Sequence, residues 1–174
     1  YAAEDADITL QLKEKFVPLL KANGVEKVFQ DIDTPLIPVL LAMEYEGVRI
    51  DTEFLELYSL ELEKLARQSE EAVYEQAGVR FNLASPRQLG EVLFEKLKLD
   101  AKAKTTKTGQ YATGEDVLAK LAREHKICDD ILSFREYTKL KNTYVDTLPA
   151  LIQPRSGRVH TTFAQTIAVT GRLS

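Results

Sequence analysis

The segment from Arg80 to Gly114 holds side chains whose types and spacing suggest chemistry with phosphates. It reads RFNLASPRQLGEVLFEKLKLDAKAKTTKTGQYATG. Four lysines lie within ten residues, opposed in charge by one acid, Asp100: Lys98, Lys102, Lys104 and Lys107. Flexible ammonium groups bind phosphates as point charges, and the hydroxyls of three threonines and the backbone amides near Gly109 can add hydrogen bonds. The pattern indicates either a phosphate-binding loop or a merely solvated one.

A second basic set, Arg135, Lys139 and Lys141, lies further along the chain. Helical spacing puts Lys139 and Asn142 on one face, with Arg135 a turn away. A solvated helix face is again the alternative. Charge supports the phosphate interpretation, because residues 1–78 carry 17 acids and 7 bases whereas residues 79–174 carry 10 acids and 16 bases. A basic half favours a polyanionic partner although the whole chain has a net charge of −4.

Catalytic groups are sparse. No Asp or Glu follows Asp146 in the remaining 28 residues, whereas two-metal phosphoryl transfer needs clustered carboxylates. Tyr1 and Asp5, with Asp7 nearby, could form part of a carboxylate site, but a surface position is the simpler interpretation. His125 and His160 lie far apart and are expected to be structural, and the single cysteine, Cys128, excludes an internal disulfide.

The elements that must position these residues are mostly helices. Apolar spacing and caps predict helices over these ranges: 2–22, 35–46, 51–77, 85–96, 113–121 and 128–148. Asp51, Ser85 and Thr113 are the expected N-caps, and Gln88 is expected to complete a capping box with Ser85. The densely apolar helix 35–46 should be buried. The β-branched stretch 158–170 predicts strand.

Two of these helices are long and far apart in sequence, which predicts an antiparallel pair. The last helix should turn its apolar residues inward: Ile131, Leu132, Phe134, Tyr137, Leu140, Tyr144 and Val145. The basic loop lies between the two helices in sequence and should sit at one tip of the pair. The predicted fold class is mainly α, with a short β segment at the C-terminus.

Several motifs together resemble the bacterial DNA polymerase I family, that is, family A DNA polymerases. The resemblance covers nearly the whole chain, through YAAEDADITLQL, PLIPVLLAMEYEGVRID, FNLASPRQLGEVLFEKLKL, KTTKTGQYAT, YTKLKNTY, GRVHTTFAQ and TGRLS. It implies a fragment with three parts: residues 1–33 from the end of the 3′–5′ exonuclease domain, 34–153 from the thumb, and 154–174 from the start of the palm. One departure is Ala168, where the family usually has threonine.

The resemblance also implies roles for individual residues. Tyr1 and Asp5 match an exonuclease motif in which the tyrosine places the attacking water and the aspartate binds metal. Arg172 matches an arginine that reaches the minor groove near the primer end. The residues in thumb segments that grip the primer–template backbone are Asn82, Ser85, Lys104, Lys107, Thr108, Lys139, Asn142 and Thr143.

These features lead to a set of expectations about function. The whole enzyme would use Mg²⁺ to add nucleotides to a primer in replication and repair, whereas this chain alone should hold primer–template DNA, bind no cofactor and be inactive. We expect no signal peptide, no membrane span and a cytoplasmic protein. Residues 158–174 should be disordered or pair with a second copy to give a dimer. The alternatives are a freestanding helical protein-interaction module and a nuclease built on Tyr1 and Asp5.

Overall fold

The computed structural model describes residues 2–100, 103–106 and 109–174, and they form two units. Unit 1 comprises Tyr1–Arg49 and Ile152–Ser174, and unit 2 comprises Ile50–Leu151. Helices dominate both units, and the described strands form one two-stranded sheet. The prediction of a mainly α fold is therefore confirmed. In the described part of the chain, no helix is both long enough and apolar enough to cross a membrane.

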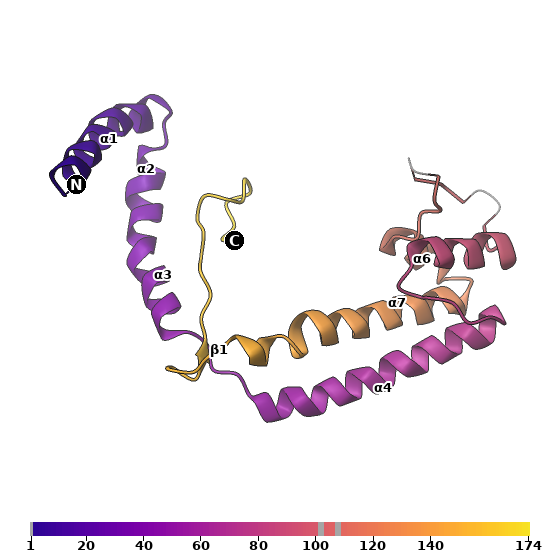
Figure 1. Ribbon diagram of the computed structural model, residues 1–174. Coiled ribbons are helices and arrows are strands. Elements are labelled where there is room, and N and C mark those ends of the chain that lie inside the picture. The colour runs from indigo at the N-terminus through magenta and orange to yellow at the C-terminus, as the bar shows by residue number, and fades with distance from the viewer. Residues whose placement is uncertain (1, 101–102, 107–108) are drawn as a thin grey trace. The chain divides into compact units, whose positions relative to one another are not determined.

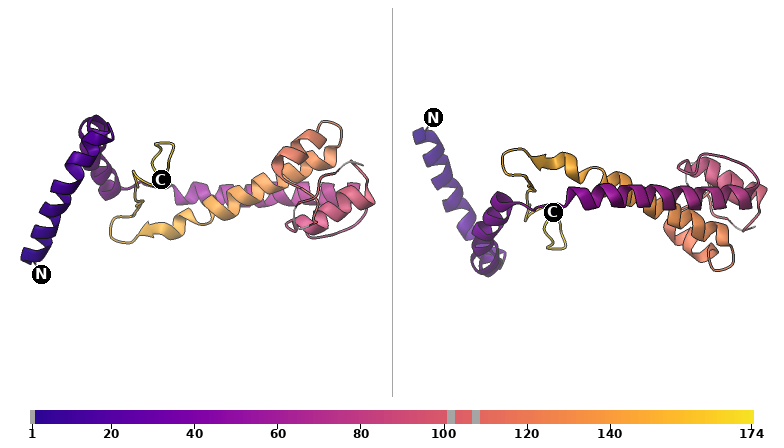
Figure 2. Two further views of the ribbon diagram at one scale, coloured as in Figure 1. Left: turned by 90° about the horizontal axis from the view of Figure 1, so that it is seen from above. Right: turned by 90° about the horizontal axis from the view of Figure 1, so that it is seen from below.

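Unit 2 is built on an antiparallel helix pair. Its elements are α4 (Thr52–Ala77), α5 (Pro86–Gly90), the π-helical η2 (Glu91–Lys96), α6 (Glu115–Leu121), α7 (Lys126–Lys139), the π-helical η3 (Leu140–Val145) and the 3₁₀ turn η4 (Leu148–Leu151). Helices α4 and α7 lie side by side in all views (Figures 1 and 2). Two hydrogen bonds fix their opposite directions: Gln76 near the end of α4 bonds Asp130 near the start of α7, and Ser59 near the start of α4 bonds Asp146 after η3.

Local sequence explains where α4 begins and ends. The Asp51 side chain accepts a hydrogen bond from the Phe54 amide at 3.0 Å, which caps the helix as predicted. Gly78 ends it in the left-handed conformation (φ 62°), which glycine adopts without steric cost. Between them, Leu62 and Val73 are buried, and α4 packs along α7.

The hydrophobic core of unit 2 lies at one end of the helix pair. Leu89 and Leu93 of α5 and η2, Leu118 of α6 and Ile131 of α7 have no exposed surface. They pack with Val73 near the end of α4. The described residues between 78 and 125 therefore fold as a cap on the tip of the pair (Figure 1).

Two capping predictions are wrong, at Gln88 and Thr113. Ser85 does cap α5, accepting from the Gln88 amide at 3.4 Å, but the Gln88 side chain bonds the Asn82 amide and not the Ser85 amide. The Ser85 amide is already bonded to the Asn82 carbonyl, so the capping box has no donor left for Gln88. The N-cap of α6 is Gly114, because Thr113 is buried and its carbonyl accepts from Arg135.

The last long helix also differs in detail from its prediction. It starts at Lys126 and is continued by η3 only to Val145. Ile131 and Val145 are buried as expected, but Tyr144 is 48% exposed. The π-helical winding of η3 changes which residues face α4, so α-helical spacing misplaces Tyr144.

Unit 1 contains α1 (Ala2–Ala22), α2 (Glu26–Val28), the π-helical η1 (Phe29–Asp33), α3 (Thr34–Glu46), β1 (Ile152–Gln153) and β2 (Arg158–Val159). The strands pair antiparallel, and Val48 forms a further bridge to Val159. Gly47 must be glycine here, because a Cβ would lie 2.7 Å from the Val159 carbonyl and its φ is 64°.

The prediction that helix 35–46 is buried is wrong. Among the described residues of α3 only Leu40 is buried, whereas Ile37, Val39, Leu41 and Met43 are each more than half exposed. A densely apolar helix marks a surface that needs covering. Nothing in the described part of unit 1 covers these side chains.

The strand predicted over 158–170 is also wrong beyond Val159. The Phe163 amide donates to the Glu44 side chain at 2.6 Å, and the Gln165 side chain donates to the Asp33 carbonyl at 3.2 Å. A helical side chain thus supplies the partner of the Phe163 amide that a neighbouring strand would have supplied. Ala164 and Ser174 then exchange two backbone hydrogen bonds, which close the last residues into a loop.

Candidate nucleic-acid interface

A hollow of about 290 Å³ in unit 2 brings three of the predicted helix residues together beside the 82–85 turn. Its walls come from the 82–85 turn on one side and from α7 and η3 on the other. The lining residues are Leu83, Ala84, Phe134, Arg135, Thr138, Lys139, Asn142 and Thr143. Three of the predicted grip residues, Lys139, Asn142 and Thr143, therefore share one concave surface, which we call the α7 face.

The turn carrying Asn82 and Ser85 is held by its own hydrogen bonds. The Asn82 side chain accepts from the Ala84 amide at 3.0 Å, and the Ser85 hydroxyl caps α5. Leu83 between them is 2% exposed and anchors the turn in the core. The two predicted side chains thus shape the turn, while Ala84 stands at the rim of the hollow.

The described part of the basic loop is pinned at its base by backbone contacts. Thr105 and Tyr111 form an antiparallel bridge, and the Ala112 amide donates to the Lys104 carbonyl at 2.9 Å. The Tyr111 ring packs on Phe94 with ring centroids 5.1 Å apart. Lys104 itself is exposed. Lys107 and Thr108 lie outside the described residues, as does Lys102.

One expected donor of this loop is already used. The Gly109 amide bonds the Thr106 carbonyl at 2.9 Å, and Gly109 has a φ of 77°. That amide therefore stabilises the loop and is not available to a phosphate.

Arg135 links the loop to the α7 face. Its guanidinium is partly buried and donates to the carbonyl of Thr113 at 2.6 Å. Burial lowers the pKa of Arg135, although a guanidinium stays charged. The Ala112 amide is bonded to the Lys104 carbonyl, and the next carbonyl along the chain, that of Thr113, is bonded to Arg135. Two hydrogen bonds thus connect the loop at Lys104 to α7, the helix that carries Lys139.

Lys141 differs from the other members of the second basic set. Its ammonium bonds the Ser59 hydroxyl at 2.8 Å and the Asp146 carboxylate at 2.7 Å. Its side chain is 22% exposed, so it faces α4 and not the hollow. These contacts hold the pKa of Asp146 low, through Lys141 first and Ser59 second.

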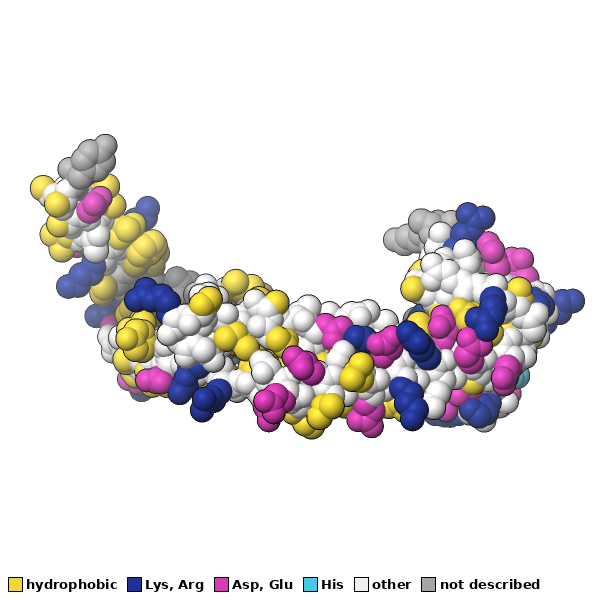
Figure 3. Space-filling model, turned by 60° about the horizontal axis from the view of Figure 1, so that its bottom comes forward, with side chains coloured by type: hydrophobic (Ala, Val, Ile, Leu, Met, Phe, Trp, Pro, Cys, Tyr) yellow, Lys and Arg dark blue, Asp and Glu magenta, His cyan; other side chains and the backbone are white. Residues whose placement is uncertain are grey.

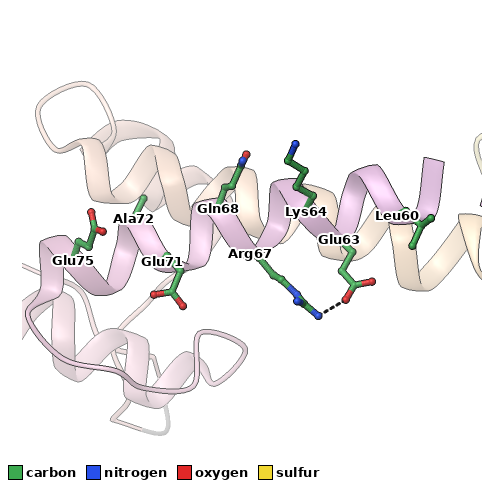
Figure 4. A pocket seen from close by; sticks show the side chains of 8 residues that line it. All are labelled: Leu60, Glu63, Lys64, Arg67, Gln68, Glu71, Ala72 and Glu75. Atoms are coloured by element: carbon green, nitrogen blue, oxygen red, sulfur yellow. Dashed lines mark hydrogen bonds and ion pairs between the residues drawn. The ribbon is translucent and has the colours of Figure 1, made fainter. Parts of the chain in front are cut away.

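The outward side of α4 is unlike the α7 face. A shallow hollow of about 670 Å³ runs along it, and Figure 4 shows the side chains that line it: Leu60, Glu63, Lys64, Arg67, Gln68, Glu71, Ala72 and Glu75. Arg67 is paired with Glu63. Figure 3 shows acidic and hydrophobic side chains intermixed along the helix pair. With three acids and two bases, this side would repel a polyanion more than attract it.

The remaining predicted site residues belong to unit 1. Asp5 is exposed in the first turn of α1, and Tyr1 lies outside the described residues. Throughout the described ranges, no three His, Cys, Asp or Glu side chains gather as a metal site would require. Arg172 is exposed in the closed C-terminal loop and donates to the Thr170 hydroxyl at 3.3 Å.

Sequence reasoning missed the residues that hold the interface in shape. Thr113 is buried, and its carbonyl anchors Arg135. Gly90 lies against Tyr111, where a Cβ would be 2.8 Å from the Tyr111 Cβ. A glycine inside a well-capped helix is itself a signal of close packing. The sequence marks Thr113 only as an expected N-cap and gives no sign that its carbonyl anchors Arg135.

The profile of DNA polymerase family A matches residues 52–174, which include the whole α7 face and the basic loop. The chain belongs to this family. It is 48% identical over 176 residues to a thermostable DNA polymerase I of Thermus thermophilus, covering 98% of this chain and 21% of that protein. It is 44% identical to DNA polymerase I of Rhizobium leguminosarum, covering 100% of this chain and 17% of that protein. The chain thus spans about a fifth of the length of these relatives.

A solved structure shares the fold. It is the POL domain of Pol1 from M. smegmatis in complex with DNA primer-template and dNTP, 38% identical in sequence with a TM-score of 0.81. The match covers 95% of this chain and 29% of that one. The resemblance to family A polymerases noted from the motifs is therefore confirmed.

Proposed function

We propose that unit 2 grips the backbone of primer–template DNA as the thumb of a DNA polymerase I. The observation that carries the proposal is the α7 face, where Lys139, Asn142 and Thr143 line one hollow beside the 82–85 turn. Lys104, in the basic loop of the same unit, is exposed and adds a second lysine to the proposed grip. The solved relative bound to primer-template supports the same assignment.

The chemistry of these groups suits backbone contacts. Lysine binds a phosphate as a point charge, and hydroxyl and amide groups can donate to phosphate oxygens without reading bases. Asn82 and Ser85 belong to the proposed grip by their place in the turn. Lys107 and Thr108, which lie outside the described residues, belong to it by their match to thumb segments of the family. Arg172 would contact the minor groove near the primer end. The proposed division is residues 1–33 exonuclease end, 34–153 thumb and 154–174 start of the palm.

The whole protein would add nucleotides to a primer with Mg²⁺ and work in the bacterial cytoplasm. Asp5 would be one ligand of a separate exonuclease metal site, with Tyr1 placing the water. The described part of the chain does not gather a ligand set for either metal site. Its own contribution is to bind and orient the duplex.

Salt dependence tests the proposal. Duplexes of two unrelated sequences should bind with similar affinity, and log K should fall linearly with log salt as counterions are released. Replacing Lys104 and Lys139 with alanine should reduce the slope by about one to two, roughly one for each lost phosphate contact. Lys64→Ala on the outward side of α4 is the matched control and should leave the slope unchanged. A double variant that binds like wild type would contradict the proposed grip.

The exposed apolar side chains of α3 favour a second candidate, contact with protein. An apolar interface weakens little with salt, in contrast to DNA backbone binding. Salt-insensitive association through Ile37 and Leu41 would support it.

A further inference from the structure

Three side chains from two helices form a closed hydrogen-bonded group behind the α7 face. The Ser59 hydroxyl donates to one Asp146 carboxylate oxygen at 2.6 Å. The Lys141 ammonium donates to the other carboxylate oxygen at 2.7 Å and to the Ser59 hydroxyl at 2.8 Å. Each member therefore bonds the other two, and we call this group the Ser59 clamp.

The clamp coincides with the π-helical turn η3. The Asp146 amide bonds the Lys141 carbonyl at 2.9 Å, five residues back, where an α-helix would bond four back. Residues five apart in an α-helix point about 140° away from each other, at about 100° per residue. In an α-helical turn Lys141 and Asp146 would therefore point to different sides, whereas the wider turn lets both contact Ser59. The side-chain clamp and the wider backbone turn therefore favour each other.

Asn142 and Thr143 lie inside this turn, between the two clamp residues. They line the hollow with Lys139 while Lys141 faces α4. The winding of η3 thus decides how Asn142 and Thr143 lie relative to Lys139. If the turn relaxed to α-helical spacing, those three groups would no longer keep their present arrangement.

We propose that Ser59, Lys141 and Asp146 are positioning residues that hold the winding of η3 and so place Asn142 and Thr143 for the duplex backbone. The inference rests on the proposed grip of unit 2. It assigns Lys141 a role that its charge alone would not suggest. Lys141 acts on Asp146 and Ser59 inside the protein, whereas Lys139, two residues away, acts on DNA.

Salt dependence of duplex binding separates these two roles. Lys139→Met should reduce the slope of log K against log salt by about one, as expected for a lost phosphate contact. Lys141→Met, Asp146→Asn and Ser59→Ala should each weaken binding about threefold to tenfold, the range of one lost hydrogen bond, with the slope unchanged. Ser59→Thr restores the hydroxyl and should restore affinity. Ser69→Ala, on the same helix, should have no effect.

A readout without DNA tests the clamp itself. Deuterium exchange of the Asp146 amide should be faster in Ser59→Ala than in wild type, and should return to the wild-type rate in Ser59→Thr. If Ser59→Ala fails to fold, as judged by circular dichroism, Lys141→Met and Asp146→Asn decide the question.

The outcomes distinguish the clamp from the grip. Clamp variants with wild-type affinity would overturn the clamp and leave the grip intact. A reduced slope in Lys141→Met would make Lys141 a phosphate contact, which also overturns the clamp. A wild-type chain that does not bind duplex, with Lys139→Met no different, would overturn the grip and with it the positioning role.

Discussion

Individual residues of unit 2 divide between those offered to solvent and those used internally. Lys104 and Lys139 are exposed, whereas Arg135 and Lys141 are bonded to protein groups. Four basic residues that look alike in the sequence therefore do different work. Periodicity predicts which face a residue occupies, but it does not show which partner is already present on that face.

Cys128 gives a prediction at the level of one thiol. Its side chain has no exposed surface, and burial raises its pKa to about 11. The thiolate is the reactive form, so a thiol reagent at pH 8 should modify the folded chain at least about 100-fold more slowly than the chain in denaturant. Equal rates in the two states would contradict the burial of Cys128.

The same shift predicts how stability changes at alkaline pH. The folded state favours the protonated thiol of Cys128. The contribution of this thiol to the free energy of unfolding is therefore complete below the ordinary pKa of 9.0 and is lost as pH rises toward about 11. The free energy of unfolding should fall over this range. Cys128→Ala cannot titrate and should show a smaller fall, measured by urea unfolding at each pH.

Gly90 gives a second prediction, about the support of the basic loop. A Cβ there would lie 2.8 Å from the Tyr111 Cβ, which is not the movable end of a side chain. Replacing Gly90 with alanine would stabilise the helix by about 1 kcal/mol through the higher helix propensity of alanine. Overpacking against Tyr111, however, would cost roughly 1–3 kcal/mol. Gly90→Ala should therefore destabilise the chain by about 1 kcal/mol, measured by urea unfolding. In a Tyr111→Gly background the same change should become neutral or stabilising, and an equal cost there would refute the contact.

At the level of elements, the helices of unit 2 follow from local signals. The Asp51 cap, the left-handed Gly78 and the apolar stripe through Leu62 are all legible in the sequence and all present in the structure. Asp51→Ala should destabilise the chain by about 1 kcal/mol in urea unfolding, the usual cost of a lost N-cap. Asp51→Asn keeps the acceptor and should cost much less. Equal losses would show that the capping bond is not the cause.

Other elements could not be predicted because tertiary partners determine them. The 158–170 stretch has strand propensity. In the structure, however, the Phe163 amide donates to the Glu44 side chain, and the Gln165 side chain donates to the Asp33 carbonyl; both acceptors lie on helical segments. The spacing of apolar residues does not indicate the π-helical winding of η3. The prediction that Tyr144 faces inward was therefore wrong. Of the site, the lysines and the turn residues were predictable by type. The grouping of Lys139, Asn142 and Thr143 in one hollow beside the 82–85 turn depended on a long-range packing that one sequence does not show.

At the scale of the whole molecule, the tail invites a test of association. Dimerisation through residues 158–174 stays a prediction, and the bonds that Ala164 and Ser174 exchange within one chain compete with it. An extended segment with unused backbone groups can pair with another copy. If the tail pairs with a second copy, and is not disordered in solution, the mass should be that of a dimer for the whole chain and that of a monomer for a chain ending at Pro154. Equal masses would show that the tail drives no association.

The claim that the α7 face binds duplex DNA is tested most directly by mapping amide resonances while a short primer–template duplex is added to the ¹⁵N-labelled chain. We expect the shifts to concentrate in three segments: residues 82–85, 103–112 and 135–143. The amide resonances of Glu63, Arg67 and Glu71, on the outward side of α4, should not shift. Shifts centred on that side of α4, or none at a duplex concentration that saturates binding, would contradict the account.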